Sequence, residues 1–211
     1  MTEPQRNPVG DPPRGLTAHR IGMIAIIALF VIPVALSWSL FYSGWKPVGT
    51  VNYGELIHPA RPLQTPILDD RFGKAVPEDW MYGKWTLLYL TDTACDESCR
   101  QRVITLAKIR LGQNRHIDRI QVALMMSGQS GFATLAEWLR PEADLITMAP
   151  IMKDRRKTIG NFEVDAMEGP VFERTYLIDP LGNLMMRYPV DFDPTGLRKD
   201  LERLLKLSQV G

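Results

Sequence analysis

The feature that most limits how this chain can fold is a long apolar stretch, from Ile21 to Tyr42, that carries no charged side chain. About 20 helical residues span the ~30 Å of hydrocarbon in a bilayer. The stretch therefore predicts one transmembrane helix at 21–42. A cleavable signal peptide is the alternative, but its apolar core is typically only about 7 to 15 residues long. The residues around Trp38 also make a poor cleavage site, so we expect an uncleaved anchor.

The charges that flank this stretch predict its orientation. Arg6, Arg14 and Arg20 precede it, whereas Lys46 is the only basic residue close behind it. Basic residues next to a membrane helix are enriched on the cytoplasmic side. We therefore expect a single-pass protein with its N-terminus in the cytoplasm and the remainder of the chain on the other side of the membrane.

Composition divides the chain into four segments. Residues 1–20 are rich in Pro, Gly and Arg and show no period, which predicts a disordered cytoplasmic tail ahead of the transmembrane helix at 21–42. Residues 43–69 contain many Pro and Gly and predict an extended juxtamembrane arm, while 70–211 has the size of a single domain. The formal net charge is +1, without a basic block, so nucleic acid is not an expected partner.

The chain has two cysteines, Cys95 and Cys99, just after the apolar run 85–90. A strand that leads a cysteine pair to the start of a helix suits redox or soft-metal chemistry, because free amides at a helix N-terminus stabilise a thiolate. Cysteines four apart on one continuous helix are poorly aimed at each other. A disulfide therefore requires Cys95 to lie in the turn before the first helical residue. A bridge that only stabilises the domain is the alternative interpretation.

Apolar patterning beyond residue 80 predicts an alternating α/β domain. The expected elements, in order, are a strand at 85–91, a helix at 96–111, a buried strand at 120–126, an amphipathic helix at 132–139, a hairpin of strands at 175–178 and 184–188, and a closing helix that begins at Asp193-Pro194. This order is that of a thioredoxin-like domain, in which helices cover both faces of a mixed sheet.

Three motifs carry a family resemblance: the strand end Tyr89-Leu90, the Cys95-Asp-Glu-Ser-Cys99 motif and the hairpin Tyr176-Leu-Ile-Asp-Pro-Leu-Gly182. With the single N-terminal anchor, they resemble the Sco/SenC branch of the thioredoxin superfamily. The chain also resembles small membrane-anchored proteins of proteobacteria that are associated with cytochrome c oxidase assembly. The resemblance covers about residues 80–207. It implies a thioredoxin-like domain in the periplasm, anchored in the bacterial inner membrane.

In that family, two cysteines and a downstream histidine bind copper, which passes to the binuclear copper centre of cytochrome oxidase, and the cysteines also act as a dithiol. The resemblance implies that Cys95 and Cys99 are the catalytic thiols and the metal ligands here, with Cu(I) as the metal. It also implies a cytochrome c oxidase subunit or another assembly factor as the partner.

The family's histidine has no counterpart in this chain. Its position falls at about Val171, and no histidine lies after His116. Because Cu(I) can be held by two thiolates and a thioether, methionines are candidate replacements. These candidates are Met125, Met126, Met148, Met152, Met167, Met185 and Met186. Methionines in strands more often fill gaps in a core, so none is assigned as a ligand. His58 and His116 would ligate only if the arm or a helix end folded over the site.

The spacer between the cysteines argues against rapid, general disulfide exchange. Efficient oxidoreductases usually have a two-residue spacer and a cis-proline that faces the disulfide. Here the spacer is Asp96-Glu-Ser98, and Glu173 stands near the expected proline position. Negative charge from Asp92, Asp96 and Glu97 disfavours the thiolate. A slow, partner-specific dithiol role therefore stays open.

Two functions from different classes remain open. The first is cytochrome c oxidase biogenesis by thiol-disulfide exchange or transient Cu(I) handling at Cys95 and Cys99. The second is a non-catalytic assembly protein, in which the anchor and the arm bind an oxidase subunit while the cysteines form a structural disulfide.

Overall fold

The computed structural model describes residues 16–44, 52–64, 67–92, 94–135, 144–164 and 169–208. The chain forms two compact units, one at residues 1–49 and one at residues 50–211.

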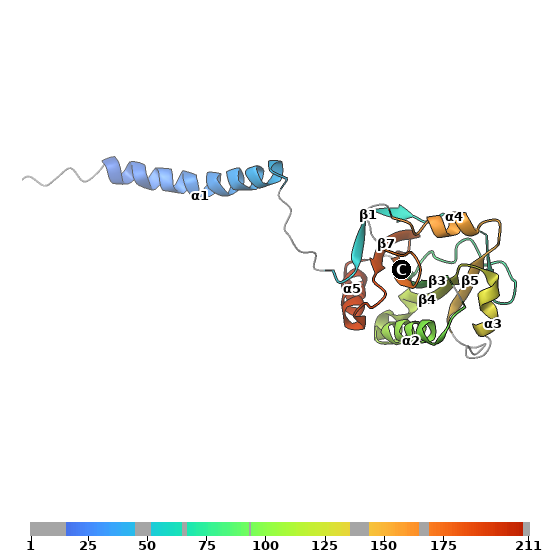
Figure 1. The fold of residues 1–211 in the computed structure, drawn as a ribbon. Coiled ribbons are helices and arrows are strands. Elements are labelled where there is room, and N and C mark those ends of the chain that lie inside the picture. The colour runs from blue at the N-terminus through green and yellow to red at the C-terminus, as the bar shows by residue number, and fades with distance from the viewer. Residues whose placement is uncertain are drawn as a thin grey trace, which may run out of the picture. The chain divides into compact units, whose positions relative to one another are not determined.

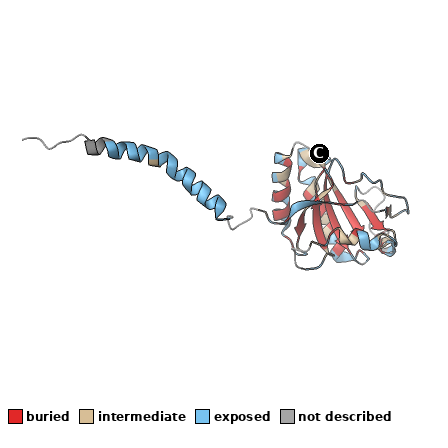
Figure 2. Ribbon diagram, turned by 90° about the horizontal axis from the view of Figure 1, so that it is seen from above, coloured by how far each residue is buried: buried red, intermediate tan, exposed pale blue. Residues whose placement is uncertain are grey.

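The first unit contains one long helix, α1 (Leu16–Tyr42). Its segment Arg20–Tyr42 is long and apolar enough to cross a membrane, and none of its most apolar window is buried within the protein. Figure 2 shows almost the whole helix as exposed. Large apolar side chains such as Leu29 and Phe30, both 70% exposed, are unfavourable in water and favourable in lipid. The helix therefore has the properties of a single-pass membrane anchor.

The second unit is built on one seven-stranded mixed sheet, in the order β1-β7-β6-β3-β4-β5-β2 (Figure 1). The strands are β1 (Glu55–Pro62), β2 (Leu68–Asp70), β3 (Trp85–Thr91), β4 (Ile120–Met126), β5 (Ile146–Pro150), β6 (Arg174–Ile178) and β7 (Asn183–Tyr188). The helices are α2 (Glu97–Leu111), α3 (Phe132–Leu135), α4 (Arg155–Gly160) and α5 (Pro194–Leu207), with short 3-10 helices at Asn114–Arg119 and Gln129–Gly131. Strands β3, β4 and β5 run parallel, and the other pairs are antiparallel.

Two hydrophobic cores lie on opposite faces of this sheet, and β3 contributes to both. Leu87 and Tyr89 pack with the apolar stripes of α2 and α5 on one face. Leu88 and Leu90 pack on the other face with residues of α4 and of the chain before β3. Figure 2 shows the buried strands between more exposed outer layers. Every residue of β3 is buried, as expected for a central strand covered on both sides.

Most of the predicted elements are confirmed. The strands expected at 85–91 and 120–126 coincide with β3 and β4, and the predicted hairpin is formed by β6 and β7. Helix α2 begins at Glu97, one residue after the predicted start, and α5 follows its N-cap Asp193. Of the helix expected at 132–139, the first turn is α3 and the rest lies outside the described residues. The predicted mixed sheet with flanking helices is therefore observed.

The sequence-based prediction lacks β5 and the two outer strands of the sheet, β1 and β2. Strand β1 and most of β2 come from the segment 43–69, which we expected to be an extended arm, and Asp70 is the last residue of β2. Pro59 and Pro62 made β1 a poor strand candidate, but β1 lies at the sheet edge, where a missing N–H donor is tolerated. The arm thus belongs in part to the sheet.

Buried Asp200 of α5 fastens the start of this segment to the domain. Its carboxylate accepts the backbone N–H groups of Tyr53 at 2.9 Å and Gly54 at 3.0 Å. It also accepts the Tyr188 hydroxyl at 3.2 Å. Burial, and then the nearby Asp200 charge, holds the pKa of Tyr188 far above its usual value, so the hydroxyl stays a donor. A Cβ atom at Gly54 would lie 2.7 Å from the Tyr188 ring, so the close approach requires glycine.

We expect Asp200→Ala to lower the free energy of unfolding by about 1–3 kcal/mol, because buried donors lose their acceptor. Urea denaturation of the full-length protein in detergent, followed by tryptophan fluorescence, measures this change. The control Glu202→Ala removes only a partly exposed pair with Arg198 on the same helix and should cost less than about 0.5 kcal/mol. Equal losses in the two variants would contradict the fastening role of Asp200.

Candidate functional site

The Cys95–Cys99 disulfide lies where the chain passes from β3 into α2. Asp96 is the N-cap of α2, in an extended conformation at φ −77° and ψ −171°, and its carboxylate accepts the Cys99 N–H at 2.9 Å. This bond, followed by one from Ser98, holds the pKa of Asp96 below its usual value. Cys95 therefore precedes the first helical residue, as the spacing required. The two Cα atoms are 5.1 Å apart, within the ordinary range for a disulfide.

Both cysteines are buried, whereas the residues between them are exposed. Cys95 is 3% and Cys99 is 1% exposed, and both belong to the hydrophobic cluster that contains Tyr89 and Phe192. The spacer 96–98 is exposed throughout. A protein that approaches the site meets this acidic spacer before it meets either sulfur atom.

Arginines accompany two of the three acidic residues expected around the thiols. Asp92 lies 3.2 Å from Arg155 at the start of α4, and Glu97 lies 3.5 Å from Arg100 one turn along α2. These pairs are substantially exposed, so each contributes little to stability. They nevertheless offset part of the negative charge that the sequence predicts beside the disulfide.

A polar cluster on the same strand was missed by sequence reasoning. The hydroxyls of Tyr89 and Thr91 donate to the two carboxylate oxygens of Glu173, each at 2.6 Å. Burial, and then the hydrogen bond to Glu173, holds the pKa of Tyr89 well above its usual value. Glu173 has a left-handed backbone, with φ +59°, at the position where a cis-proline was considered. The signal in the sequence was two hydroxyl residues at i and i+2 on a buried strand.

The described residues contain no cluster of His, Cys, Asp and Glu that would form a three-ligand copper site. No group of three or more His, Cys, Asp or Glu side chains among them is arranged to hold a metal ion. His58 is an exposed residue of β1, and His116 follows the far end of α2, beside Arg115 and Arg119. Val171, at the family's histidine position, packs against the core on the opposite face. Among the described residues, no histidine or carboxylate therefore completes a group of three ligands with Cys95 and Cys99.

The described methionines are mainly core residues, and the candidate Met167 lies outside the described residues. Met125 and Met148 are buried on the sheet face opposite to the disulfide. Met126 and Met186 are buried in the cluster that contains the cysteines, and Met152 is 90% exposed. The described methionines therefore support the expectation that thioethers fill gaps in the core.

Together, a mixed sheet flanked by helices, a CxxxC disulfide at a helix N-terminus and an apolar helix near the N-terminus define a membrane-anchored thioredoxin-like protein. The chain belongs to the family described as "Transmembrane-like, thioredoxin-like, C-terminal domain", whose model matches residues 85–208. No curated protein matches the sequence significantly.

Solved structures confirm the expected likeness to Sco proteins. Yeast Sco1 with copper bound has a TM-score of 0.58 at 15% identity, covering 72% of this chain and 96% of that chain. Arabidopsis thaliana ScoI with copper bound has a TM-score of 0.54 at 18% identity, covering 71% and 99%. BsSco, described as a Sco-family cytochrome c oxidase assembly protein with a disulfide switch, has a TM-score of 0.53 at 10% identity, covering 73% and 99%. These likenesses establish a shared fold.

We expect Asp96→Ala to lower the free energy of unfolding by about 0.5–2 kcal/mol, because α2 loses the side chain that caps it. Asp96→Ser should recover most of this loss, since serine is also a good N-cap. Urea denaturation with tryptophan fluorescence is the measurement. Ser98→Ala, which removes only an exposed hydrogen bond to Asp96, is the control. A full loss in Asp96→Ser would be inconsistent with a capping role.

Proposed function

We propose that this protein acts in cytochrome c oxidase biogenesis by thiol-disulfide exchange between Cys95–Cys99 and the copper-site cysteines of an oxidase subunit or another assembly factor. The observation that carries the proposal is a disulfide at the mouth of α2, in a fold shared with proteins described as oxidase assembly proteins.

The exchange conserves electrons and protons. In the reduced protein, a thiolate attacks the partner's disulfide to give a mixed disulfide, and the second cysteine of the pair resolves it. The partner then carries two thiols, and Cys95 and Cys99 are bonded. Two electrons and two protons have passed to the partner, and a separate dithiol reductant restores the starting state. The positive end of the α2 dipole favours the attacking thiolate, whereas the Asp96 carboxylate, which accepts the Cys99 N–H, opposes it.

The proposed location is the bacterial inner membrane, with the N-terminus in the cytoplasm and the thioredoxin-like domain in the periplasm. The support is the apolar helix Arg20–Tyr42 and the excess of arginines before it. A disulfide persists in such an oxidising compartment, whereas cytosolic thiols would tend to reduce it.

In the proposed function, the protein binds copper only transiently, as an ion that it passes on. The reduced Cys95 and Cys99 would provide two soft sulfur ligands that suit Cu(I). Because the described His, Cys, Asp and Glu side chains form no group of three ligands, the proposal includes no resident copper ion.

The second candidate is a non-catalytic assembly protein, and the burial of the disulfide favours it. Both cysteines are at most 3% exposed, as in a bridge whose role is to brace a domain. In this case the anchor and the segment 43–69 bind an oxidase subunit. The two candidates differ in which residues the function requires: the cysteines in the first, and the anchor and the segment 43–69 in the second.

Replacing both cysteines distinguishes the two candidates. In cells that lack the wild-type copy, Cys95→Ser/Cys99→Ser should leave copper loading of the oxidase at the level of the deletion strain, because no dithiol remains. The exposed arm residues allow a matched variant, Leu56→Ser/His58→Ala, which should restore loading. The measurements are copper per purified oxidase and its activity. Normal loading with the serine variant and failure of the arm variant would establish the scaffold instead.

Copper handling is tested by anaerobic competition titration of the reduced full-length protein in detergent. We expect one Cu(I) to be taken from a weak chromogenic chelator and lost to a strong one, because two thiolates act without a third ligand. Cys95→Ser/Cys99→Ser should bind none. Retention against the strong chelator would contradict the two-ligand assignment and direct attention to Met126 and Met186, which share the buried cluster with the cysteines.

A further inference from the structure

The cluster of Tyr89, Thr91 and Glu173 joins two segments that are distant in sequence. Tyr89 and Thr91 stand two residues apart on β3, so their side chains leave the same face of the sheet. Both hydroxyls reach Glu173, which immediately precedes β6. The Glu173 N–H also donates to the Leu90 carbonyl at 2.7 Å. Glu173 is therefore held to the carboxyl end of β3 by three hydrogen bonds.

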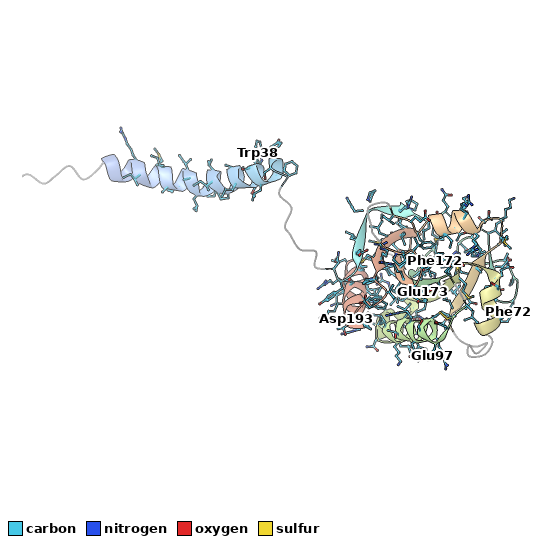
Figure 3. The ribbon with its side chains drawn as sticks, viewed as in Figure 1. Trp38, Phe72, Glu97, Phe172, Glu173 and Asp193 are labelled. Atoms are coloured by element: carbon cyan, nitrogen blue, oxygen red, sulfur yellow. A yellow bond between two sulfur atoms is a disulfide. The ribbon has the colours of Figure 1, made fainter. Side chains whose placement is uncertain are left out.

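Tyr89 belongs to the same hydrophobic core as the disulfide. Tyr89 is buried in the hydrophobic cluster that contains Cys95 and Cys99, on the face covered by α2. The charge of Asp96, next to Cys95, acts on the Tyr89 hydroxyl together with the charge of Glu173. Figure 3 labels Glu173 in the domain and Glu97 on α2, the helix that carries Cys99. Tyr89 thus connects the Glu173 carboxylate to the hydrophobic cluster that contains both cysteines.

We propose that Glu173 is a positioning residue of the disulfide site: by holding the Tyr89 hydroxyl, it fixes the packing around Cys95–Cys99 and favours the disulfide over the dithiol. This inference rests on the proposed function only in that the exchange uses both states. The reaction concerned is reduction of the Cys95–Cys99 bond by two glutathione molecules. It gives two protein thiols and one glutathione disulfide, with no net change in electrons or protons.

The physical reason is the lack of room around the sulfur atoms. Breaking the bond leaves two thiols that need more space than a bonded pair, and both cysteines are almost completely buried. Protein interiors are close-packed, so neighbouring side chains must move to provide that space. A Tyr89 ring held at its hydroxyl resists this movement. Keeping the hydrogen bonds to Glu173 therefore costs more free energy in the dithiol state than in the disulfide state.

The backbone of Glu173 supports a specific role for its side chain. A residue other than glycine at φ +59° adopts a conformation that is rare for L-residues and costs free energy. The bonds that its carboxylate makes to Tyr89 and Thr91 offset that cost. Glycine would suit the backbone but lacks the carboxylate, so Glu173→Gly removes the side-chain bonds while relieving the strain.

The test is the equilibrium of the purified full-length protein in detergent with reduced and oxidised glutathione, with free thiols counted after alkylation. We expect Tyr89→Phe and Glu173→Gly each to shift the equilibrium constant about three- to ten-fold toward the dithiol, the size of one or two buried hydrogen bonds. The double variant should shift it no further than the larger single change, because both break the same contact. No shift in either single variant would overturn the proposal.

Two further variants separate positioning from charge and from general loosening. Glu173→Gln retains one acceptor and one donor of similar shape, so it should stay within about two-fold of wild type, less than one typical hydrogen bond. Tyr176→Phe removes a buried hydroxyl bond of 2.7 Å to Val171 on the opposite face, so it should leave the glutathione equilibrium unchanged. A full shift in either control would overturn the proposal. The glutathione equilibrium needs no client, so its outcome is independent of the copper-loading test.

Discussion

The complete burial of β3 is the constraint on which the rest of the domain depends. The strand pairs with β4 on one side and β6 on the other, and its side chains alternate between the two cores. A shift of one residue would exchange the two sets of side chains, so the register is strongly determined. The same strand leads directly to Cys95 and carries Tyr89, which bonds Glu173 at the start of β6. The positions of the disulfide and of Glu173 therefore both follow from the packing of one strand.

The sequence predicted the parts of the fold that leave a local pattern. The apolar run of β3, the helical spacing of α2 and the N-cap Asp193 of α5 can each be recognised from a few neighbouring residues. The spacing of the cysteines also required Cys95 to precede the helix if the two were to form a disulfide. Strand β1 was missed because its proline-rich segment becomes a strand only through its contacts with β7 and Asp200. The Glu173 cluster was missed because it joins residues more than 80 positions apart, and no local pattern records such a contact.

The residues around the disulfide affect which molecules can reach its sulfur atoms. The sulfur atoms lie beneath an exposed spacer that carries Asp96 and Glu97, with Arg100 and Arg155 close by. A small reductant gains little by contacting this spacer, whereas a protein with a complementary surface can use binding energy to displace it. In the proposed function, exchange that depends on binding a complementary partner would let the protein act on one client and leave other disulfides intact.

The docking of β1 also determines how the domain would respond to cleavage near the membrane. Strand β1 is the outermost strand, and it covers the edge of β7. Without it, β7 would present a row of unpaired backbone groups of the kind that recruits another chain. Pro59 and Pro62 lack N–H donors and so blunt the outer edge of β1 itself. A protease that cuts ahead of Asn52 would leave β1 attached to the domain and the edge of β7 covered. A cut after Pro62 would separate β1 from the rest of the domain, and once β1 dissociates, β7 could pair with another chain.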